Sequence, residues 1–344
     1  MKSDHQHTKL FSRSEWSEIS HLLAEVGRSV RKAVRGDEAL RGSQKVVGFA
    51  GGDTIFKIDK IAEEELLEAF SKWPERYKPI QLYGEGLDEE GSVVGDRRCR
   101  PRIAILIDPI DGTRNIMYDK RSAWFIAAAA AWQEKRPTTD DIRASVLVEL
   151  PPSKAGLSDI FVLASDGPLI AERTPLAGGG GKRWIPRPSG SKDLEFGFAQ
   201  VANFFPGTKV LASELMEFIA ANVSGSARVG ESLIFDDQYL STAGQFVELL
   251  CGHDRFCCDL RPLFHRILAQ RDTSFQHGLE CHPYDIAGLK IAEAAGVILT
   301  DGFGNKLTAP FDCNTGIHWC GYANVEIQKL VQPVVQRWLD ENLP

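Results

Sequence analysis

The sequence has no long apolar segment. No run of about 18 consecutive apolar residues occurs in the 344-residue chain, so we expect no transmembrane helix. The first eleven residues are polar, include His5 and His7, and have no apolar core of the kind that a secretory signal needs. These absences predict a cytoplasmic protein without a membrane partner.

Cysteine is present but lacks the spacing of a disulfide framework. The seven cysteines are odd in number and include no Cys-x-x-Cys pair, which indicates a reducing compartment. Cys251, His253, Cys257 and Cys258 lie close in sequence, yet their spacing fits no common zinc pattern. Because cysteine is a frequent core residue, we interpret this cluster as packing rather than as a metal site.

An excess of positive charge is also missing. The net charge of −7 argues against nucleic acid as a partner, because phosphate backbones are bound through clustered cations. A small phosphorylated substrate is not excluded, since bound metal ions would reverse the local field. The length exceeds what one core usually supports and predicts two fused subdomains, while 43% apolar and 25% charged residues are typical of a globular protein.

The most informative stretch is Ile107-Asp108-Pro109-Ile110-Asp111-Gly112-Thr113-Arg114-Asn115. The apolar run Ile103 to Ile107 before it predicts a buried strand. Pro109 favours an extended backbone at Asp108, so Asp108 should end this strand and Asp111 should follow in a turn. The two carboxylates would then lie at one edge of a sheet.

The residues after Asp111 suit an anion. Gly112 lets the backbone approach a ligand closely, and the amides of Gly112 and Thr113 would open a short helix, where an anion is favourably placed. Carboxylates and a phosphate repel each other in one pocket unless divalent cations lie between them. The stretch therefore predicts a metal and phosphate site, and the alternative is a local Asx-type turn that leaves a core strand.

Residues 108–115 resemble the Asp-Pro-x-Asp-Gly-Thr-x-Asn signature of the inositol monophosphatase family. This family comprises magnesium-dependent, often lithium-sensitive sugar phosphatases that are related to fructose-1,6-bisphosphatase. Most positions of the signature are fixed, which makes it more specific than a lone glycine motif. The resemblance implies an α/β phosphatase with a layered αβαβα architecture, a small phosphorylated substrate and a homodimer.

A loose resemblance extends to the segment Asp53 to Glu63. In the family, a Thr-x-x-Asp type motif precedes a helix that begins with acidic residues, and Asp59 is the matching position here. The resemblance implies that Asp59 acts as the partner of Thr113. Its alternative role is that of a helix N-cap.

The segment Gln81 to Gly86 is similar to the Gly-Glu-Glu element of the family, whose first glutamate binds metal. Glu85 is therefore the expected ligand and catalytic residue. Gly86 replaces the usual second glutamate, and the nearby acids that are candidates to replace it are Asp88, Glu89 and Glu90.

A third segment, Tyr284-Asp285-Ile286-Ala287-Gly288, resembles the Trp-Asp-x-Ala-Ala-Gly signature of the family. Tyr284 replaces the usual tryptophan, and Gly288 comes one residue early. The resemblance implies that Asp285 starts a helix and reaches the metal pair from the second subdomain. An N-cap role is compatible with this, because one carboxylate can serve both purposes.

The resemblance implies a complete site with two or three Mg²⁺ ions. Glu85, Asp108 and the Ile110 carbonyl would hold one ion, and Asp108, Asp111 and Asp285 a second. Thr113, hydrogen-bonded to Asp59, would position the attacking water, while the Gly112 and Thr113 amides would bind phosphoryl oxygens. Li⁺ is a possible inhibitor by the same resemblance.

The substrate stays open at this level. Gly278 occupies the place of the inositol-recognising glutamate of the family, and Glu280 or Gln276 are candidates to substitute for it. Inositol phosphate is the default, with fructose-1,6-bisphosphate, a nucleotide 3′-phosphate or histidinol phosphate as alternatives. The candidate cations for a second anionic group are Arg255, Arg261 and Lys209.

The expected subdomains are residues 1–195, with the main metal motif, and residues 196–344, which contribute Asp285.

We predict a helix over 14–34 from its apolar spacing. Residues 122–132 contain five consecutive alanines, which favour a helix, but the family resemblance implies a central strand. The resemblance also implies a helix over Phe235 to Gly244 and a strand over Phe246 to Leu250.

A protein of another class is a second hypothesis. A catalytically weak relative would bind metal or a sugar phosphate and regulate another process. The presence of Thr113 argues against it, because a binding module has no need of a hydroxyl that positions water.

Overall fold

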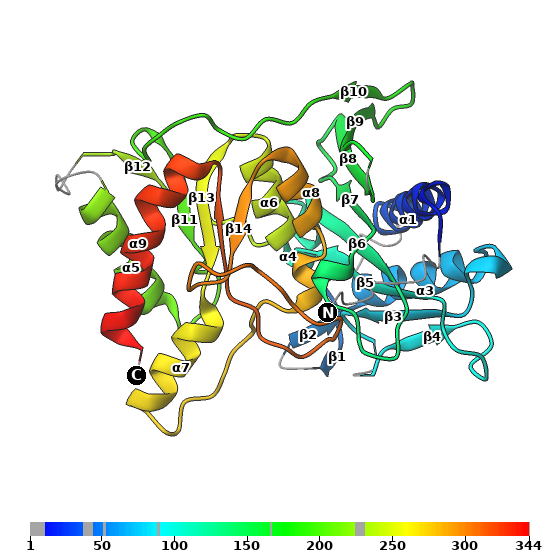
Figure 1. The fold of residues 1–344 in the computed structure, drawn as a ribbon, viewed down its shortest axis with the longest axis horizontal. Helices are drawn as coiled ribbons and strands as arrows, with labels where there is room; N and C mark the ends of the chain where they lie inside the picture. Colours follow the sequence, from blue (N-terminus) through cyan, green and yellow to red (C-terminus); the bar gives the residue numbers. More distant parts are fainter. Residues whose placement is uncertain are drawn as a thin grey trace, which may run out of the picture.

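The computed structural model describes residues 11–36, 44–50, 53–87, 90–165, 167–223 and 231–343. Within them, layers of helices and sheets alternate across the molecule, as Figure 1 shows from α9 to α1. Three separate clusters of buried apolar side chains fill the spaces between the layers. The predicted αβαβα architecture is therefore confirmed.

The larger sheet comprises eight strands of the described chain in the order β10-β9-β8-β7-β6-β5-β3-β4. Its central strand β5 pairs parallel with β3 and antiparallel with β6. A separate hairpin joins β1 (Val46–Ala50) and β2 (Asp53–Phe56). The strands of the larger sheet are β3 (Ile80–Gly84), β4 (Ser92–Val94), β5 (Ile103–Asp111), β6 (Ala123–Ala131), β7 (Ala144–Leu150), β8 (Leu157–Ala164), β9 (Ile170–Pro175) and β10 (Lys182–Trp184).

The alanine-rich segment forms strand β6, in agreement with the resemblance and against intrinsic propensity. Its backbone pairs with β5 on one side and β7 on the other. Alternate side chains enter two cores, with Phe125 on the side of α1 and Trp124 and Ile126 on the opposite side. Tertiary pairing on both edges therefore outweighs the weak helix preference of alanine.

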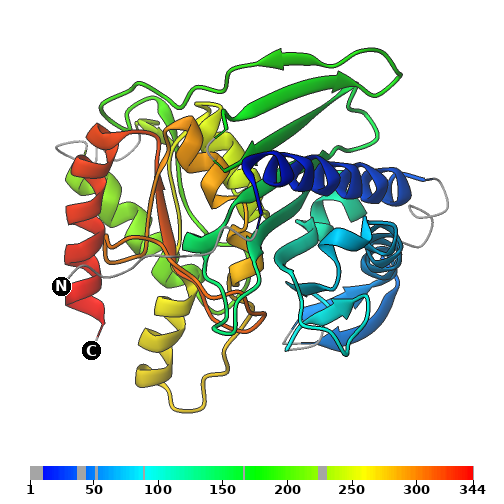
Figure 2. The ribbon, with the colours of Figure 1, turned by 45° about the vertical axis from the view of Figure 1, so that its right-hand side comes forward.

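Two helices cover one face of the larger sheet. Helix α1 (Arg13–Val34) contacts β7 and β8, and α3 (Lys57–Ser71) contacts β5. In Figure 2, α1 lies across this sheet. Ser12 and Glu15 form a capping box at the start of α1, which satisfies amides that the first helical turn leaves unpaired.

The smaller sheet comprises five strands of the described residues in the order β12-β11-β13-β15-β14. Helices α6 and α8 lie between the two sheets, and α5, α7 and α9 cover the outer face of the smaller one (Figure 1). The strands are β11 (Gly197–Val201), β12 (Ile234–Phe235), β13 (Asp254–Asp259), β14 (Ile298–Thr300) and β15 (Trp319–Tyr322). The helices are α5 (Lys209–Val223), α6 (Thr242–Leu250), α7 (Arg261–Arg271), α8 (Leu289–Ala295) and α9 (Val325–Asn342).

Short helical segments complete the described elements. Helix α4 (Thr113–Met117) follows β5 directly. The single-turn 3₁₀ segments are η1 (Glu75–Tyr77), η2 (Thr139–Asp141) and η3 (Pro283–Ile286). Both α4 and η3 lie at the end of β5, where the predicted site residues are found.

The expectation for residues 235–250 was wrong. Phe235 ends strand β12, residues 236–241 are irregular, and Thr242–Leu250 is helix α6 rather than a strand. The Ser241 side chain accepts a hydrogen bond from the Gly244 amide, so the helix begins one residue after a strong N-cap. Asp236 and Asp237 therefore precede the helix as exposed acids.

Two further expectations concern membrane-spanning helices and the boundary between the subdomains. None of the described helices is long and apolar enough to cross a membrane. The division at residue 195 stays a prediction, although it falls between the last strand of the larger sheet, β10, and the first strand of the smaller sheet, β11.

Candidate functional site

The centre of the site is the carboxyl end of β5. The pairing of β5 with β6 shifts register between Asp108 and Asp111, and the Ile110 amide donates to Asp108 Oδ1 at 2.8 Å. Asp111 is therefore the last residue of the strand, not a turn residue as expected. Gly112 follows with φ +90°, and a Cβ there would lie 2.8 Å from the Leu240 carbonyl oxygen, so only glycine fits this turn.

The Thr113 hydroxyl lies against Asp59, as the resemblance implied. Thr113 Oγ1 is 3.1 Å from Asp59 Oδ1 and 3.0 Å from the Ile110 carbonyl oxygen. Asp59 Oδ2 accepts from the Phe56 amide at 2.7 Å, in the first turn of α3. Asp59 therefore stabilises the helix start and holds the threonine hydroxyl at the same time.

Asp111 links strand β5 to helix α6. Its Oδ2 accepts from Ser241 Oγ at 2.7 Å and from the Ala243 amide at 2.6 Å. The Thr242 amide lies 3.3 Å from Oδ1. A carboxylate of the larger sheet thus caps helix α6, which fixes the position of α6 relative to β5.

Asp285 and Glu85 reach the same place from other segments. Asp285 lies in η3, where its Oδ2 accepts from the His282 amide at 2.6 Å, so it closes a capping box instead of starting the helix itself. Glu85 follows β3 and lines the same pocket, together with Asp108, Asp111 and Asp285. Asp88 and Glu89 lie outside the described residues.

Burial makes it unfavourable for these carboxylates to ionise together. The pKa of Asp108 is raised by burial and then by the charges of Glu85, Asp111 and Asp285. Burial raises the pKa of Asp111 to about 6, against the opposing hydrogen bonds from Ser241 and the α6 amides. The pKa of Asp285 is raised by burial and by the Asp111 charge. A cation among them would relieve this repulsion.

The donor set fits a hard divalent cation. Asp108, Asp111 and Asp285 each offer a carboxylate oxygen, and these oxygens lie within 4.8 Å of one another. Ile110 and Glu85 line the same pocket. Mg²⁺ prefers oxygen ligands and retains water, so the residues present suit it. The described part of the chain therefore contains an acidic cluster that can bind a metal.

A buried arginine, Arg261, also lines the pocket. Arg261 Nη2 lies 2.6 Å from Asp259 Oδ2, and both side chains are almost fully buried. The Arg261 guanidinium also lies over the ring of Phe204 and donates to the Leu279 carbonyl. Of the three candidate cations for a second anionic group, Arg261 alone lines the pocket among the residues described.

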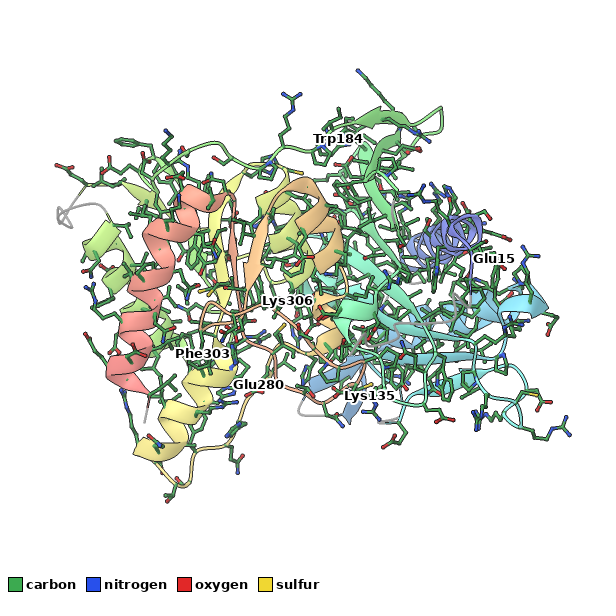
Figure 3. The ribbon with its side chains drawn as sticks, viewed as in Figure 1. Glu15, Lys135, Trp184, Glu280, Phe303 and Lys306 are labelled. Atoms are coloured by element: carbon green, nitrogen blue, oxygen red, sulfur yellow. The ribbon has the colours of Figure 1, made fainter. Side chains whose placement is uncertain are left out.

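The other two cations lie elsewhere. Arg255 pairs with Asp193, and Lys209 donates to the Asn203 carbonyl. Glu280 lines the pocket, and Figure 3 labels it on the segment between α7 and η3. Gln276 is exposed and does not line this pocket. Of these two candidates, only Glu280 lines the pocket among the residues described, and its role stays a prediction.

Two members of the cysteine cluster pack in separate cores. Cys257 and Cys258 are consecutive on β13 and enter different cores, on opposite faces of the smaller sheet. Side chains on opposite faces of a strand cannot share one ion. Cys251 lies at the end of α6 and is half-buried.

Sequence reasoning missed several residues of the pocket. Ser241 binds Asp111, Asp259 holds Arg261, and Phe204, Phe205 and His282 line the walls. Ser241 had a usable signal, because a serine just before an apolar helical run is a typical N-cap. The phenylalanines lie in a loop, and no spacing links them to residues 108–115.

No family model matches the sequence, and no curated protein matches it significantly. Solved structures match over nearly the whole chain. The fructose-1,6-bisphosphatase of Leishmania major in holo form has a TM-score of 0.63 at 14% identity, and the match covers 97% of this chain and 96% of that one. The extragenic suppressor protein SuhB of Bartonella henselae has a TM-score of 0.59 at 15% identity, with 96% and 100% covered.

A hypothetical protein of Pyrococcus horikoshii with similarities for inositol-1 monophosphatase has a TM-score of 0.58 at 15% identity, and the match covers 95% of this chain and 98% of that one. These likenesses concern the fold, and they agree with the family to which the signature at residues 108–115 points. The chain has the same fold as these solved structures of a SuhB protein, a fructose-1,6-bisphosphatase and a protein with similarities for inositol-1 monophosphatase.

Proposed function

We propose that this protein is a magnesium-dependent phosphomonoesterase that hydrolyses a small phosphorylated sugar or polyol. One observation carries the proposal. Carboxylates from three distant segments, after β3, at the end of β5 and in η3, line one pocket together with Thr113. The hydroxyl of Thr113 contacts Asp59. A binding site for metal alone has no use for this last pair.

Thr113 and Asp59 would position the attacking water. The hydroxyl has one proton, and it lies within hydrogen-bond distance of both Asp59 Oδ1 and the Ile110 carbonyl. When the proton points to Asp59, the hydroxyl oxygen accepts a hydrogen bond from a water in the pocket. The Gly112 and Thr113 amides would bind the phosphoryl oxygens as their charge redistributes.

The ligands for Mg²⁺ would be Glu85, Asp108, Asp111, Asp285 and the Ile110 carbonyl, which suffices for two or three ions. Bound Mg²⁺ would supply a clamp on the attacking and leaving oxygens and a lowered pKa for water. Two of these ligands are already oriented by the protein, since Asp111 is held by α6 and Asp285 by the His282 amide. Little rearrangement of these two side chains would accompany ion binding.

The pocket wall bears on the substrate. Glu280 would accept hydrogen bonds from sugar hydroxyls, as the family resemblance suggests for an inositol-like ring. Arg261 is buried and charged beside the same pocket, which favours a substrate with a second acidic group. Fructose-1,6-bisphosphate or a nucleotide 3′-phosphate is therefore the second candidate, next to an inositol monophosphate.

The decisive experiment is phosphate release from inositol, sugar and nucleotide phosphates, with and without Mg²⁺ and with Li⁺ added. We expect Mg²⁺-dependent release from at least one compound, and its loss in Asp111→Asn. Asp236→Asn is the matched control, because Asp236 is an exposed acid outside the pocket. Absence of release from every compound, with Mg²⁺ still bound, would instead support the regulatory binding protein.

A further inference from the structure

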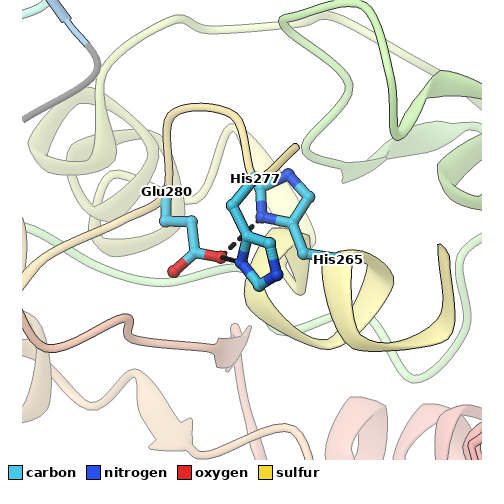
Figure 4. Close-up of side chains that lie close together, drawn as sticks. All are labelled: His265, His277 and Glu280. Carbon is cyan, nitrogen blue, oxygen red and sulfur yellow. Dashed lines mark hydrogen bonds and ion pairs between the residues drawn. The ribbon is translucent and has the colours of Figure 1, made fainter. Parts of the chain in front are cut away.

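A second group of metal-ligating side chains lies beside the pocket. His265 on α7 and His277 and Glu280 on the following segment place one ligand atom each within 4.8 Å of the others. Figure 4 shows both imidazoles directed at the same carboxylate. His265 Nδ1 lies 2.5 Å from Glu280 Oε1, and His277 Nδ1 lies 3.6 Å from that oxygen.

We propose that His265, His277 and Glu280 bind a divalent transition metal of the Zn²⁺ type. Two imidazoles and one carboxylate, with a remaining position for water, form a donor set that zinc uses in proteins. Imidazole ligands select zinc-like ions, whereas Mg²⁺ prefers oxygen. The acidic cluster of the pocket, with oxygen donors, would therefore bind a different ion.

The surroundings of the three side chains suit this role. His265 is 3% exposed, so the protein fixes its ring, and the Phe275 ring packs 5.6 Å from it, centroid to centroid. The His277 side chain is 56% exposed, which gives an ion access from solvent.

The consequence would be a clamp next to the catalytic pocket. The metal would tie residues 272–282 to α7, and this segment also carries Leu279, whose carbonyl accepts from Arg261 at 3.0 Å. Glu280 lines the pocket as well. An ion at this place would therefore fix the wall that faces the substrate.

The test is a titration of metal-stripped protein in saturating Mg²⁺, with Co²⁺ as an absorbing probe and Zn²⁺ in competition with a coloured chelator. We expect one equivalent of Zn²⁺ in the wild type and equally in Asp111→Asn. His277→Gln should lower the affinity at least about tenfold. The exposure of His277 makes this variant safe for folding, and His265→Gln should repeat the loss.

The matched control is His253→Gln. His253 Nδ1 lies 2.5 Å from Glu248 Oε2, the same pair as His265 with Glu280, but no second histidine joins it among the groups found in the described residues. This variant should bind Zn²⁺ like the wild type. Equal Zn²⁺ affinity of the wild type and His277→Gln, or loss of Zn²⁺ binding in Asp111→Asn, would overturn the proposal. The three side chains would then only interact with one another.

Discussion

The central strands of the two sheets end in buried aspartates beside one pocket, yet these aspartates have opposite surroundings. At the end of β13, Asp259 forms an ion pair with Arg261. At the end of β5, Asp108 and Asp111 face Glu85 and Asp285 instead. The charge of Arg261 lowers the pKa of Asp111, but the ion pair of Arg261 is formed with Asp259.

The difference shows how one residue type serves two purposes. The charge of Asp259 is neutralised within the chain, so this aspartate holds the fold and orients Arg261. At the end of β5, the charges of Glu85, Asp111 and Asp285 raise the pKa of Asp108 in addition to burial, and the charge of Asp111 raises that of Asp285. The charge of Arg261 offsets this only in part, at Asp111 and Asp285. A buried carboxylate without an internal cation requires an external one or a proton.

The largest expected effect is that of Asp108→Asn on turnover. Under the proposed function, it should lower the rate of phosphate release about a thousandfold, because a buried metal ligand is lost. The same change removes one of several repelling charges, so it should raise the Tm of the metal-free protein by a few degrees. Calorimetry in EDTA and a phosphate assay in Mg²⁺ measure the two effects, with Asp236→Asn as control. A lower Tm in EDTA would contradict the repulsion.

Asp259→Asn should behave in the opposite way. It leaves Arg261 buried and unpaired, and we expect a loss of about 3–5 kcal/mol in the free energy of unfolding. Urea denaturation with and without Mg²⁺ measures this loss, which should be present in both conditions. The double change Asp259→Leu with Arg261→Met should recover much of the stability, because it removes both buried charges. A loss below about 1 kcal/mol in the free energy of unfolding of Asp259→Asn would show that the ion pair with Arg261 does not stabilise the end of β13.

Thr113→Ala tests the role of the Thr113 hydroxyl, which is hydrogen-bonded to Asp59 and would position the attacking water. Under the proposed function, the rate of phosphate release should fall about a hundredfold, while Mg²⁺ affinity stays close to that of the wild type. Thr113→Ser keeps the hydroxyl and should retain most of the activity. An unchanged rate in Thr113→Ala would remove the positioning role from Thr113 and Asp59.

The smallest effect concerns an exposed ion pair, His253 with Glu248. The hydrogen bond to Glu248 raises the pKa of His253. The contribution of this hydrogen bond to the free energy of unfolding should be complete below the ordinary pKa of histidine. It should disappear as the pH rises through the raised pKa of His253. Because the His253 side chain is 64% exposed, we expect less than about 1 kcal/mol. The difference in Tm between wild type and His253→Gln, measured from acid to alkaline pH, should shrink accordingly.

Local patterns predicted most elements and the core of the site. The apolar spacing of α1 and the buried run before Asp108 are short-range signals, and the structure confirms both. The expectation for residues 235–250 was wrong, because the resemblance to the family did not take account of Ser241 as a helix N-cap. For the alanines of β6 the resemblance was right and intrinsic propensity was wrong: propensity predicts a helix, but pairing with β5 and β7 makes the segment a strand.

The sequence by itself placed the carboxylates Asp108 and Asp111 between a buried strand and a helix start, because these elements follow one another within a few residues. The expected fold came from the resemblance of residues 108–115 to a family signature. The resemblance pointed to Asp285, and Arg261 was one of three candidates, but only the tertiary structure shows these distant groups and Ser241 in one pocket. Asp285, Ser241 and Arg261 are far from Asp108 along the chain, and the packing of α6, α7 and η3 between and beside the sheets brings them to one pocket. Sequence spacing does not encode such convergence, since it depends on how whole elements pack.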